Sequence, residues 1–452
     1  MIVFEMKTAA GNGICKHMAS QNLMPTMYDD WSLNTSIFIG KARKIVREIT
    51  YGLSIFVRSR TAFLLLMGCA ALLKLLLSTF APVSFFLRDV ALGPGVTSSV
   101  SPLVMINAQI YRLWQSVTGS NATGANWWAA PPATFSGSLL ALSLALRLPS
   151  FIFDAAIAAT IYFVIMNRAS PREARLASLL WFLNPYMIMV VELLNVPDVA
   201  AVFVTVVAVL FLYRKRIFLT SLLITIGITI GLYPILILPP ILIYCRKKLR
   251  ITGICQALLA ILPLLAGVGY VTFYQTISPL DALLNYIVGS EVSPAALAIV
   301  ITCFAVWRFN RTLEITDSIL PVLLVYYTFS NPPPQYYLWA LPFLIIDIVL
   351  VERRHLVLLM VLLAFVLGSW FISSGCFLTS SGYSLLFIPL EGSKLPWYSQ
   401  AIRSFLDSGA TDLLMKPLVN AGLAATTFIY ALEIIRCWFR VKPKDSRPFQ
   451  KL

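Results

Sequence analysis

Long apolar windows recur along most of this chain, and they constrain its fold more than any other feature. In hydrocarbon, backbone N–H and C=O groups have no water to bond, so a crossing segment of roughly 15 to 25 residues must form a helix. About twelve such windows occur. Their approximate bounds are 61–80, 148–166, 174–193, 198–213, 217–231, 233–245, 254–274, 294–307, 317–330, 336–351, 355–372 and 417–435. The sequence predicts an all-α polytopic membrane protein with about 12 transmembrane helices, in a range of about 10 to 13.

Composition excludes several other classes of protein. Hydrophobic residues make up 59% of the 452 residues and charged residues 12%, and mean hydropathy is +0.82. A soluble globule of this size would lack polar surface, and a disordered chain would be less apolar. The seven cysteines show no paired spacing, so neither a disulfide scaffold nor a zinc site is predicted.

The positions of the basic residues explain the formal net charge of +15. If the N-terminus is placed on the inner side, nearly all Lys and Arg residues fall on that side, as the positive-inside rule requires. The exceptions are Lys74, Arg88, Arg112, Arg147, Lys394, Arg403 and Lys416. An even number of spans returns the C-terminus to the cytoplasmic side. The charge therefore indicates orientation and attraction to anionic membrane lipids, and nucleic acid is not predicted as a partner.

The same pattern divides the chain into a membrane domain with two tails. Segment 217–245 has basic clusters at both ends, so we expect two short half-crossings broken around Gly231 and Pro234. A polar helical stretch near 102–117 predicts juxtamembrane helices in the first outer loop. The expected parts are a tail at 1–60 with a basic amphipathic stretch, the membrane domain at 61–435 with outer loops at about 81–147 and 373–416, and a basic tail at 436–452.

Charge is scarce, so the search for chemistry is short. Asp89 is the only carboxylate in the first outer loop, directly after Arg88. Beside an apolar run it is a candidate base for an acceptor hydroxyl, although an interfacial Arg–Asp pair capping a helix explains it as well. Arg147 and Asp154 are seven residues apart on one helical side, where they either pair or share a phosphate.

Two further groups of polar and aromatic residues lie at expected turns. Asn184 precedes Pro185 inside a span, and Asp198 opens the next span; a helix kink alone accounts for the Asn–Pro pair equally well. Gln335 and Tyr336 follow a run of prolines in an outer turn whose aromatic residues form either a membrane-interface belt or a platform for a sugar. The usual motifs of soluble enzymes are absent, and the two histidines, His17 and His355, are both predicted inside.

Six short motifs follow one another along the chain, each at a predicted span or outer turn. They are Asp89 after the first span, Pro149 to Asp154, the run Trp181 to Pro185, Asp198 at an outer turn, Tyr233-Pro234 in a short hairpin, and the run Pro334 to Pro342. In this order the chain resembles the GT-C superfamily of membrane glycosyltransferases over roughly residues 61–351. The branch it resembles is the mannosyltransferase that adds the first mannose in glycosylphosphatidylinositol assembly, together with related prokaryotic polyprenyl-phosphate-dependent enzymes.

The resemblance implies inverting transfer of a sugar, mannose or another hexose, from a polyprenyl-phosphate donor. The acceptor would be lipid-linked or a protein, on the outer or lumenal face, and a small membrane subunit is needed by some members. Asp89 would be the base. Candidates for binding the donor phosphate or sugar are Arg88, Arg112, Arg147, Asp154, Asn184, Asp198, Tyr233, Gln335 and Tyr336.

The chain departs from the family pattern at two places. Asp89 is followed by Val90 and Ala91, whereas the family often has a second acid in this loop. No metal ligand and no cofactor are therefore predicted. The mannosyltransferase branch also has a Lys just before its Tyr-Pro break, where this chain has Gly231 and Leu232.

Two other functions fit the same composition. Twelve spans with both termini inside are common in transporters and lipid flippases, but no half-to-half repeat is detectable here. An inactive GT-C-like protein that scaffolds a glycosylation complex would explain the missing second acid. The expected location is the plasma membrane in a prokaryote and the endoplasmic reticulum in a eukaryote.

Overall fold

The computed structural model divides the chain into two units, Met1–Ile55 and Phe56–Leu452. It describes residues 59–80, 102–118, 137–193, 195–196, 198–247, 260–267, 294–309, 314–330, 334–350, 355–373 and 416–440, all in the second unit. Residues 1–58 of the predicted tail at 1–60, residues 441–452 of the predicted tail at 436–452, most of the two outer loops, and Arg88 and Asp89 lie outside these residues.

Most of the chain in the described ranges is helical, and no strand occurs in them. Several helices begin at a proline, whose missing N–H is unneeded in a first helical turn. The α-helices are α3 (Arg60–Phe80), α5 (Pro102–Thr118), α6 (Gly137–Met166), α7 (Pro171–Phe182), α8 (Pro185–Met187), α9 (Asp198–Tyr213), α10 (Ile217–Ile230), α11 (Leu238–Lys247), α14 (Pro294–Phe309), α15 (Thr316–Ser330), α16 (Leu341–Leu350), α17 (His355–Ser373) and α19 (Lys416–Arg440). A π-helix (Ile188–Leu193) and the 3₁₀ helices Tyr233–Ile237 and Pro334–Trp339 interrupt the series.

Three of these helices are long and apolar enough to cross a membrane, over Arg60–Ser78, Leu140–Met166 and Leu418–Arg436. A fourth crossing results if Pro171–Phe182 and Pro185–Glu192, which are bent by 41°, form one span. The remaining apolar helices are shorter. The chain thus has apolar helices of membrane-spanning length, and the larger number of spans expected from the sequence remains a proposal.

The helix bounds match most of the apolar windows, with one clear difference. α6 begins at Gly137, not at 148, because the stretch before Arg147 is apolar and continues the helix through Pro149. The helix thus includes Leu140–Arg147, which the sequence places at the end of the first outer loop, and Leu140–Met166 is long and apolar enough to cross a membrane. The expected break of segment 217–245 is confirmed, since α10 ends before Gly231 and Tyr233–Ile237 forms a 3₁₀ turn containing Pro234.

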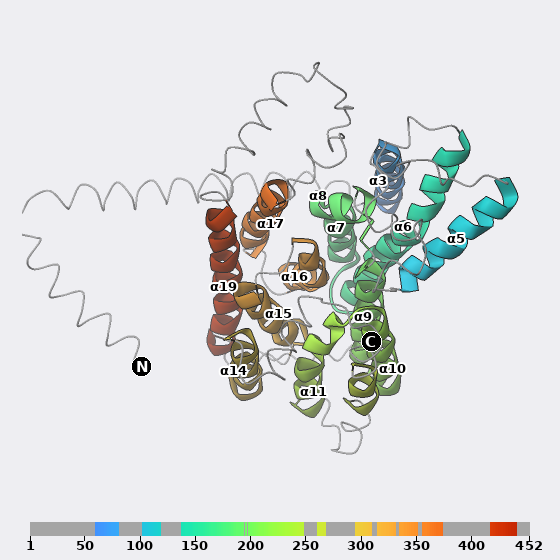
Figure 1. Ribbon diagram of the computed structural model, residues 1–452. Helices are drawn as coiled ribbons and strands as arrows, with labels where there is room; N and C mark the ends of the chain where they lie inside the picture. Colours follow the sequence, from blue (N-terminus) through green and yellow to red (C-terminus); the bar gives the residue numbers. More distant parts are fainter. Residues whose placement is uncertain are drawn as a thin grey trace, which may run out of the picture. The chain divides into compact units, whose positions relative to one another are not determined.

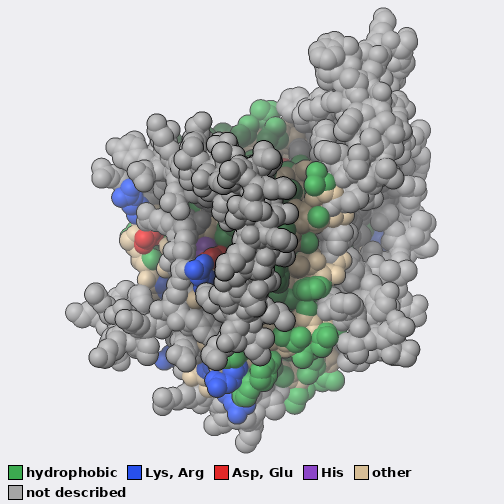
Figure 2. Space-filling model, turned by 90° about the vertical axis from the view of Figure 1, so that its left-hand side faces the viewer, with side chains coloured by type: hydrophobic (Ala, Val, Ile, Leu, Met, Phe, Trp, Pro, Cys, Tyr) green, Lys and Arg blue, Asp and Glu red, His purple; other side chains and the backbone are tan. Residues whose placement is uncertain are grey.

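The helices pack around one apolar core. The most extensive packing joins α9 with α10, α6 with α7 and α9, and α19 with α15 and α17 (Figure 1). Many leucine, isoleucine and phenylalanine side chains on α3, α6, α14 and α19 remain exposed, and Figure 2 shows hydrophobic side chains along one such face. Exposed apolar surface on long helices is the pattern of a protein whose surroundings are hydrocarbon.

Several turns that the charge pattern assigns to the inner side are neighbours in the structure. Arg168, after α6, pairs with Glu314, before α15, and its guanidinium lies 3.9 Å from the ring centre of Tyr213 at the end of α9. Lys247, at the end of α11, donates to the carbonyl of Val306 in α14 at 3.5 Å. The connections α6–α7, α9–α10, α11 and α14–α15 therefore meet at one end of the helix bundle.

Candidate functional site

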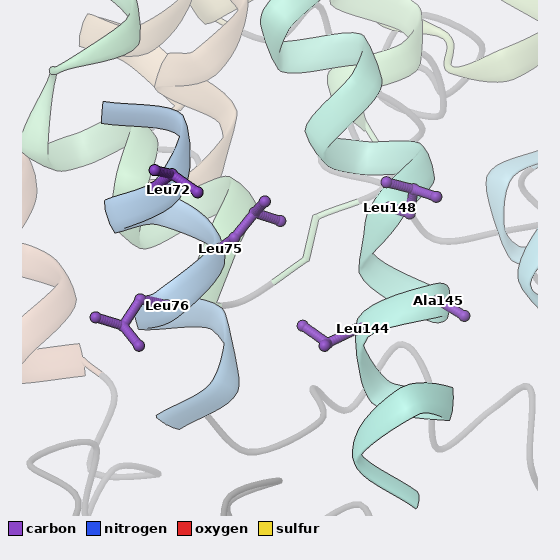
Figure 3. A pocket seen from close by; sticks show the side chains of 6 residues that line it. All are labelled: Leu72, Leu75, Leu76, Leu144, Ala145 and Leu148. Carbon is purple, nitrogen blue, oxygen red and sulfur yellow. The ribbon is translucent and has the colours of Figure 1, made fainter. Parts of the chain in front are cut away.

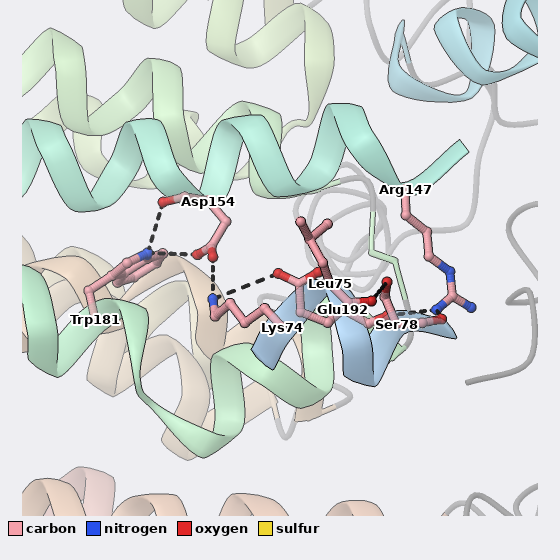
Figure 4. A network of polar contacts seen from close by, with 7 residues as sticks. All are labelled: Lys74, Leu75, Ser78, Arg147, Asp154, Trp181 and Glu192. Atoms are coloured by element: carbon pink, nitrogen blue, oxygen red, sulfur yellow. Dashed lines mark hydrogen bonds and ion pairs between the residues drawn. The ribbon is translucent and has the colours of Figure 1, made fainter. Parts of the chain in front are cut away.

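Four charged side chains are buried between α3, α6 and the π-helix (Figure 4). The Lys74 ammonium pairs with the Asp154 carboxylate and lies 3.7 Å from Glu192 Oε1. Trp181 Nε1 donates to Asp154 Oδ1 at 2.8 Å. Arg147, with 2% of its side chain exposed, is the fourth charge. We call Lys74, Arg147, Asp154, Trp181 and Glu192 the charged cluster; its two cations and two carboxylates balance.

Arg147 connects the ends of two segments that are far apart in the sequence. Its guanidinium donates to the carbonyl of Ser78, in the last turns of α3, and to the carbonyl of Glu192, in the π-helix, at 3.2 Å. Buried guanidinium groups require such acceptors, because an unpaired charge away from water is costly. Arg147 and Asp154 therefore have different partners, and each is bound by groups of the protein itself.

The irregular backbone between α7 and α9 brings Glu192 into this cluster. Asn184 caps the helix that begins at Pro185, because its Oδ1 accepts the N–H of Tyr186 at 3.0 Å. The π-helix follows, and Asn195 has a left-handed φ of 52°. Ser150 donates to Asn195 Oδ1, and Asn195 Nδ2 donates to the carbonyl of Leu146 at 3.5 Å. The Ser150 side chain and a backbone carbonyl of α6 thus hold a turn with a left-handed residue, a feature that often accompanies functional sites.

Four other predicted site residues meet in a second place. Asp198 is the first residue of α9. It lies beside Gly231, where the chain breaks before Tyr233: a Cβ atom built on Gly231 would be 3.6 Å from Asp198 Oδ1. The Tyr233 ring stacks on Trp339 with centres 4.6 Å apart and planes at 13°. Tyr336 packs against the same indole at 4.7 Å. We call Asp198, Tyr233, Gln335, Tyr336 and Trp339 the aromatic site.

Local sequence explains why the aromatic site forms. Gly231 adopts an extended backbone at the end of α10, and Pro234 cannot continue that helix, so the chain turns with the Tyr233 ring buried. The 3₁₀ helix Pro334–Trp339 is held by two tyrosine hydroxyls: Tyr186 Oη donates to the carbonyl of Gln335 at 3.0 Å, and Tyr327 Oη donates to the carbonyl of Tyr336 at 2.8 Å.

The members of the aromatic site differ in exposure. Tyr233 and Trp339 are 1% and 4% exposed, so they form its base. Asp198, Gln335 and Tyr336 are only partly buried. The elements that form this site therefore carry a carboxylate, an amide and a partly exposed aromatic ring together with a buried stacked pair. Such a mixture suits a ligand with hydroxyl groups and apolar faces, because hydroxyls bond the polar groups while C–H faces pack on rings.

The structure separates the predicted site residues into three groups. Arg147 and Asp154 join the charged cluster; Asp198, Tyr233, Gln335 and Tyr336 join the aromatic site; Asn184 caps α8. Arg112 lies on an exposed face of α5, and Arg88 and Asp89 are outside the described residues.

The sequence did not single out Lys74 and Glu192 as site residues, and it placed Trp181 and Trp339 within motif runs without assigning either a role of its own. A signal was present for Lys74, because it is the only charge within the apolar run after Arg60 in α3. An ionisable residue inside a span needs a buried partner. Glu192 lacked such a signal, since it reaches the cluster only through the π-helix.

Within the described ranges, no three His, Cys, Asp or Glu side chains come together in a way that could hold a metal ion. Comparison of the chain with protein-family models, with curated proteins and with solved structures found no match. The assignment of a function therefore rests on the two clusters and on the order of the sequence motifs.

Proposed function

We propose that this chain is an integral membrane inverting glycosyltransferase of GT-C type with about twelve spans, both termini being cytoplasmic. It moves mannose or another hexose from a polyprenyl-phosphate donor to a lipid-linked or protein acceptor on the outer or lumenal face. The observation that carries the proposal is the aromatic site. Three segments far apart in the sequence meet there: Asp198 lies beside the break at Gly231, Tyr233 stacks on Trp339, and Gln335 and Tyr336 belong to the same 3₁₀ helix as Trp339.

In this proposal the two clusters have different tasks. The aromatic site binds the sugar, and Asp89 removes the proton of the acceptor hydroxyl. The hydroxyl oxygen then attacks the anomeric carbon from the face opposite the phosphate, the bond to the phosphate oxygen breaks, and the polyprenyl phosphate leaves with both electrons. The charged cluster holds α3 to α6 and to the π-helix, and so fixes the start of the loop that carries Asp89.

Transfer by full-length protein tests this function directly. Membranes containing the chain, open on the outer side, are incubated with labelled polyprenyl- or dolichyl-phosphate sugars and lipid acceptors. We expect transfer by the wild-type protein and a loss of about a hundred-fold or more for Asp89→Asn, in line with removal of a general base. Transfer that survives this substitution would contradict the assigned base.

A second candidate function is that of a non-catalytic GT-C-like subunit of a membrane complex that handles lipid-linked glycans. It is favoured by the charged cluster, where Arg147 and Asp154 are bound by protein groups, and by the missing second acid after Asp89. Binding of the labelled lipid without transfer from any donor, together with co-purification of partner subunits, would favour this function over the enzyme.

A further inference from the structure

A buried polar atom that has no hydrogen-bond partner costs free energy, so a pair of residues that each carry one is unusual. The hollow between α3 and α6 offers no polar side chain. It is lined by Leu72, Leu75 and Leu76 of α3 and by Leu144, Ala145 and Leu148 of α6 (Figure 3). At the junction of α16 and α17, by contrast, Asp347 Oδ1 and His355 Nε2 are both buried and unpartnered, although the two residues bond each other through their other polar atoms.

One carboxylate oxygen joins three helices at this junction. Asp347 Oδ2, on α16, lies 2.7 Å from His355 Nδ1, at the first residue of α17. Tyr430 Oη, on α19, donates to the same oxygen at 3.1 Å. The imidazole and phenol rings have their centres 5.1 Å apart, and all three side chains are at most 1% exposed. We call Asp347, His355 and Tyr430 the histidine triad.

The net charge of the histidine triad depends on one proton. In the described part of the chain, His355 and Tyr430 are the groups that bond the Asp347 carboxylate. A protonated imidazole makes the triad neutral, whereas a neutral imidazole leaves the buried carboxylate without a cation, which is costly. Histidine is the side chain that gains and loses its proton between about pH 5 and 8. The cations of the charged cluster, by comparison, are a lysine and an arginine.

Other ionisable side chains lie on the triad's own helices and on their neighbours. Asp347 and His355 are the only ones in α16 and α17. On α19, Glu433 Oε1 lies 3.2 Å from Arg436 Nη1, one turn after Tyr430. The helices packed against α16 and α19 bring Asp317 of α15 and Arg172, Glu173 and Arg175 of α7. Among the described residues, none of these groups bonds Asp347 or His355, so the proton shared by that pair is the one that decides its charge.

We propose that the histidine triad is a pH-sensitive switch in the contact between α16, α17 and α19. One proton held by Asp347 and His355 keeps the contact closed. When that proton leaves, the buried carboxylate loses its cation and becomes hydrated, and His355 moves outward from its position at the first residue of α17. The closed contact binds one proton more than the open one, so its stability is present at low pH and falls as the pH rises.

The location of the triad indicates which compartment the switch senses. The connection between α16 and α17 contains Arg353 and Arg354, and the charge pattern assigns it to the cytoplasmic side. α16 and α17 also pack against the 3₁₀ helix Pro334–Trp339. The switch therefore responds to cytoplasmic pH, in helices that also contact a segment of the aromatic site.

Amide hydrogen exchange of the full-length protein in nanodiscs, between about pH 5.5 and 8.5, tests the switch. Each peptide's exchange rate is divided by its intrinsic rate at the same pH, which gives the protection. We expect the protection of residues 347–358 and 427–434 to fall with rising pH, by up to about ten-fold per pH unit, the limit for one proton. A peptide within α9 should keep the same protection throughout.

Three variants separate the proton from the hydrogen bonds. Asp347→Asn still accepts from His355 and Tyr430 but has no charge to balance, so its protection should stay high at every pH. His355→Gln donates to Asp347 without a charge, so its protection should stay low at every pH. Tyr430→Phe should lower protection by a constant factor and keep the pH dependence. His17→Gln, at the only other histidine, is the matched control and should behave as wild type.

Two results would overturn the proposal. One is wild-type protection that does not change with pH. The other is the same pH dependence in Asp347→Asn as in the wild type, because the titrating group would then lie elsewhere. If a triad variant does not fold, the imidazole nitrogen NMR signals of His355 in His17→Gln protein decide: the proton must leave over the pH range in which protection falls, and an unchanged protonation state over that range contradicts the switch.

Discussion

The charged cluster and the aromatic site both form where helices are interrupted, yet their polar groups face different partners. In the charged cluster, Lys74, Asp154 and Arg147 are at most 2% exposed and bind one another, Trp181 or backbone carbonyls. In the aromatic site, Asp198, Gln335 and Tyr336 are partly exposed, whereas Tyr233 and Trp339 form a buried stacked pair. A closed, balanced set of charges suits a structural role, whereas a partly buried carboxylate near aromatic rings suits ligand binding.

The largest expected effect breaks the charged cluster. Lys74→Met leaves the Asp154 and Glu192 carboxylates buried without their cation, so we expect a loss of about 3–5 kcal/mol in stability. In Lys74→Met/Asp154→Asn the Asn amide still accepts from Trp181, and most of that loss should be recovered. Unfolding of detergent-solubilised protein measures both, with the exposed Arg216→Met as control. If Lys74→Met is as stable as Arg216→Met, the charged cluster does not stabilise the fold.

A smaller effect comes from removing one hydrogen bond of the same cluster. Trp181→Phe keeps the ring but loses the donor that lies 2.8 Å from Asp154 Oδ1. Because the acceptor is charged, we expect a loss of about 1.5–3 kcal/mol. Trp307→Phe, at an indole that is 42% exposed, is the matched control. Equal unfolding temperatures for the two variants would argue against this role of Trp181.

Asp198→Asn should show the opposite pattern to the charged-cluster variants. Its side chain is partly exposed, so we expect little change in unfolding temperature. Loss of a charged hydrogen-bond acceptor for a sugar hydroxyl should weaken donor binding or transfer by about 10- to 100-fold. Competition binding with the labelled polyprenyl-phosphate sugar measures this. A variant that unfolds at a much lower temperature would place Asp198 with the structural residues.

The smallest expected effect concerns the support of the aromatic site. Tyr186→Phe removes the 3.0 Å hydrogen bond to the carbonyl of Gln335 and should cost about 0.5–1.5 kcal/mol in stability. Because Gln335 and Tyr336 lose one of the bonds that hold their 3₁₀ helix, donor binding should also weaken by a few-fold. Tyr162→Phe, on α6, serves as a comparison. If Tyr186→Phe lowers stability but leaves donor binding unchanged, the Tyr186 hydrogen bond does not position Gln335 and Tyr336 for binding.

The sequence predicted the helices far better than the side-chain partners. Apolar windows and prolines located most helix bounds, since burial of a backbone in hydrocarbon and the missing N–H of proline are local properties. α6 begins eleven residues before the predicted 148, because the charge of Arg147 is compensated by buried acceptors from other segments, which the local sequence does not show. Which charges meet depends on packing: Lys74 and Asp154 are 80 residues apart in the chain.

The same limit applies to the aromatic site. Tyr233, Asp198 and Gln335 each stood out at an expected turn, and sequence order alone did not show that these turns meet. The stacking of Tyr233 on Trp339 depends on the 3₁₀ helices at both positions, and the helix Pro334–Trp339 is held by tertiary hydrogen bonds from Tyr186 and Tyr327.

One measurement tests most directly the claim that the charged cluster builds the fold and the aromatic site binds the ligand. Binding of the labelled polyprenyl-phosphate sugar is measured for two folded variants, Lys74→Met/Asp154→Asn and Asp198→Asn. The account predicts near wild-type binding for the first and about 10- to 100-fold weaker binding for the second. Loss of binding in the folded double variant, with full binding retained by Asp198→Asn, would contradict it.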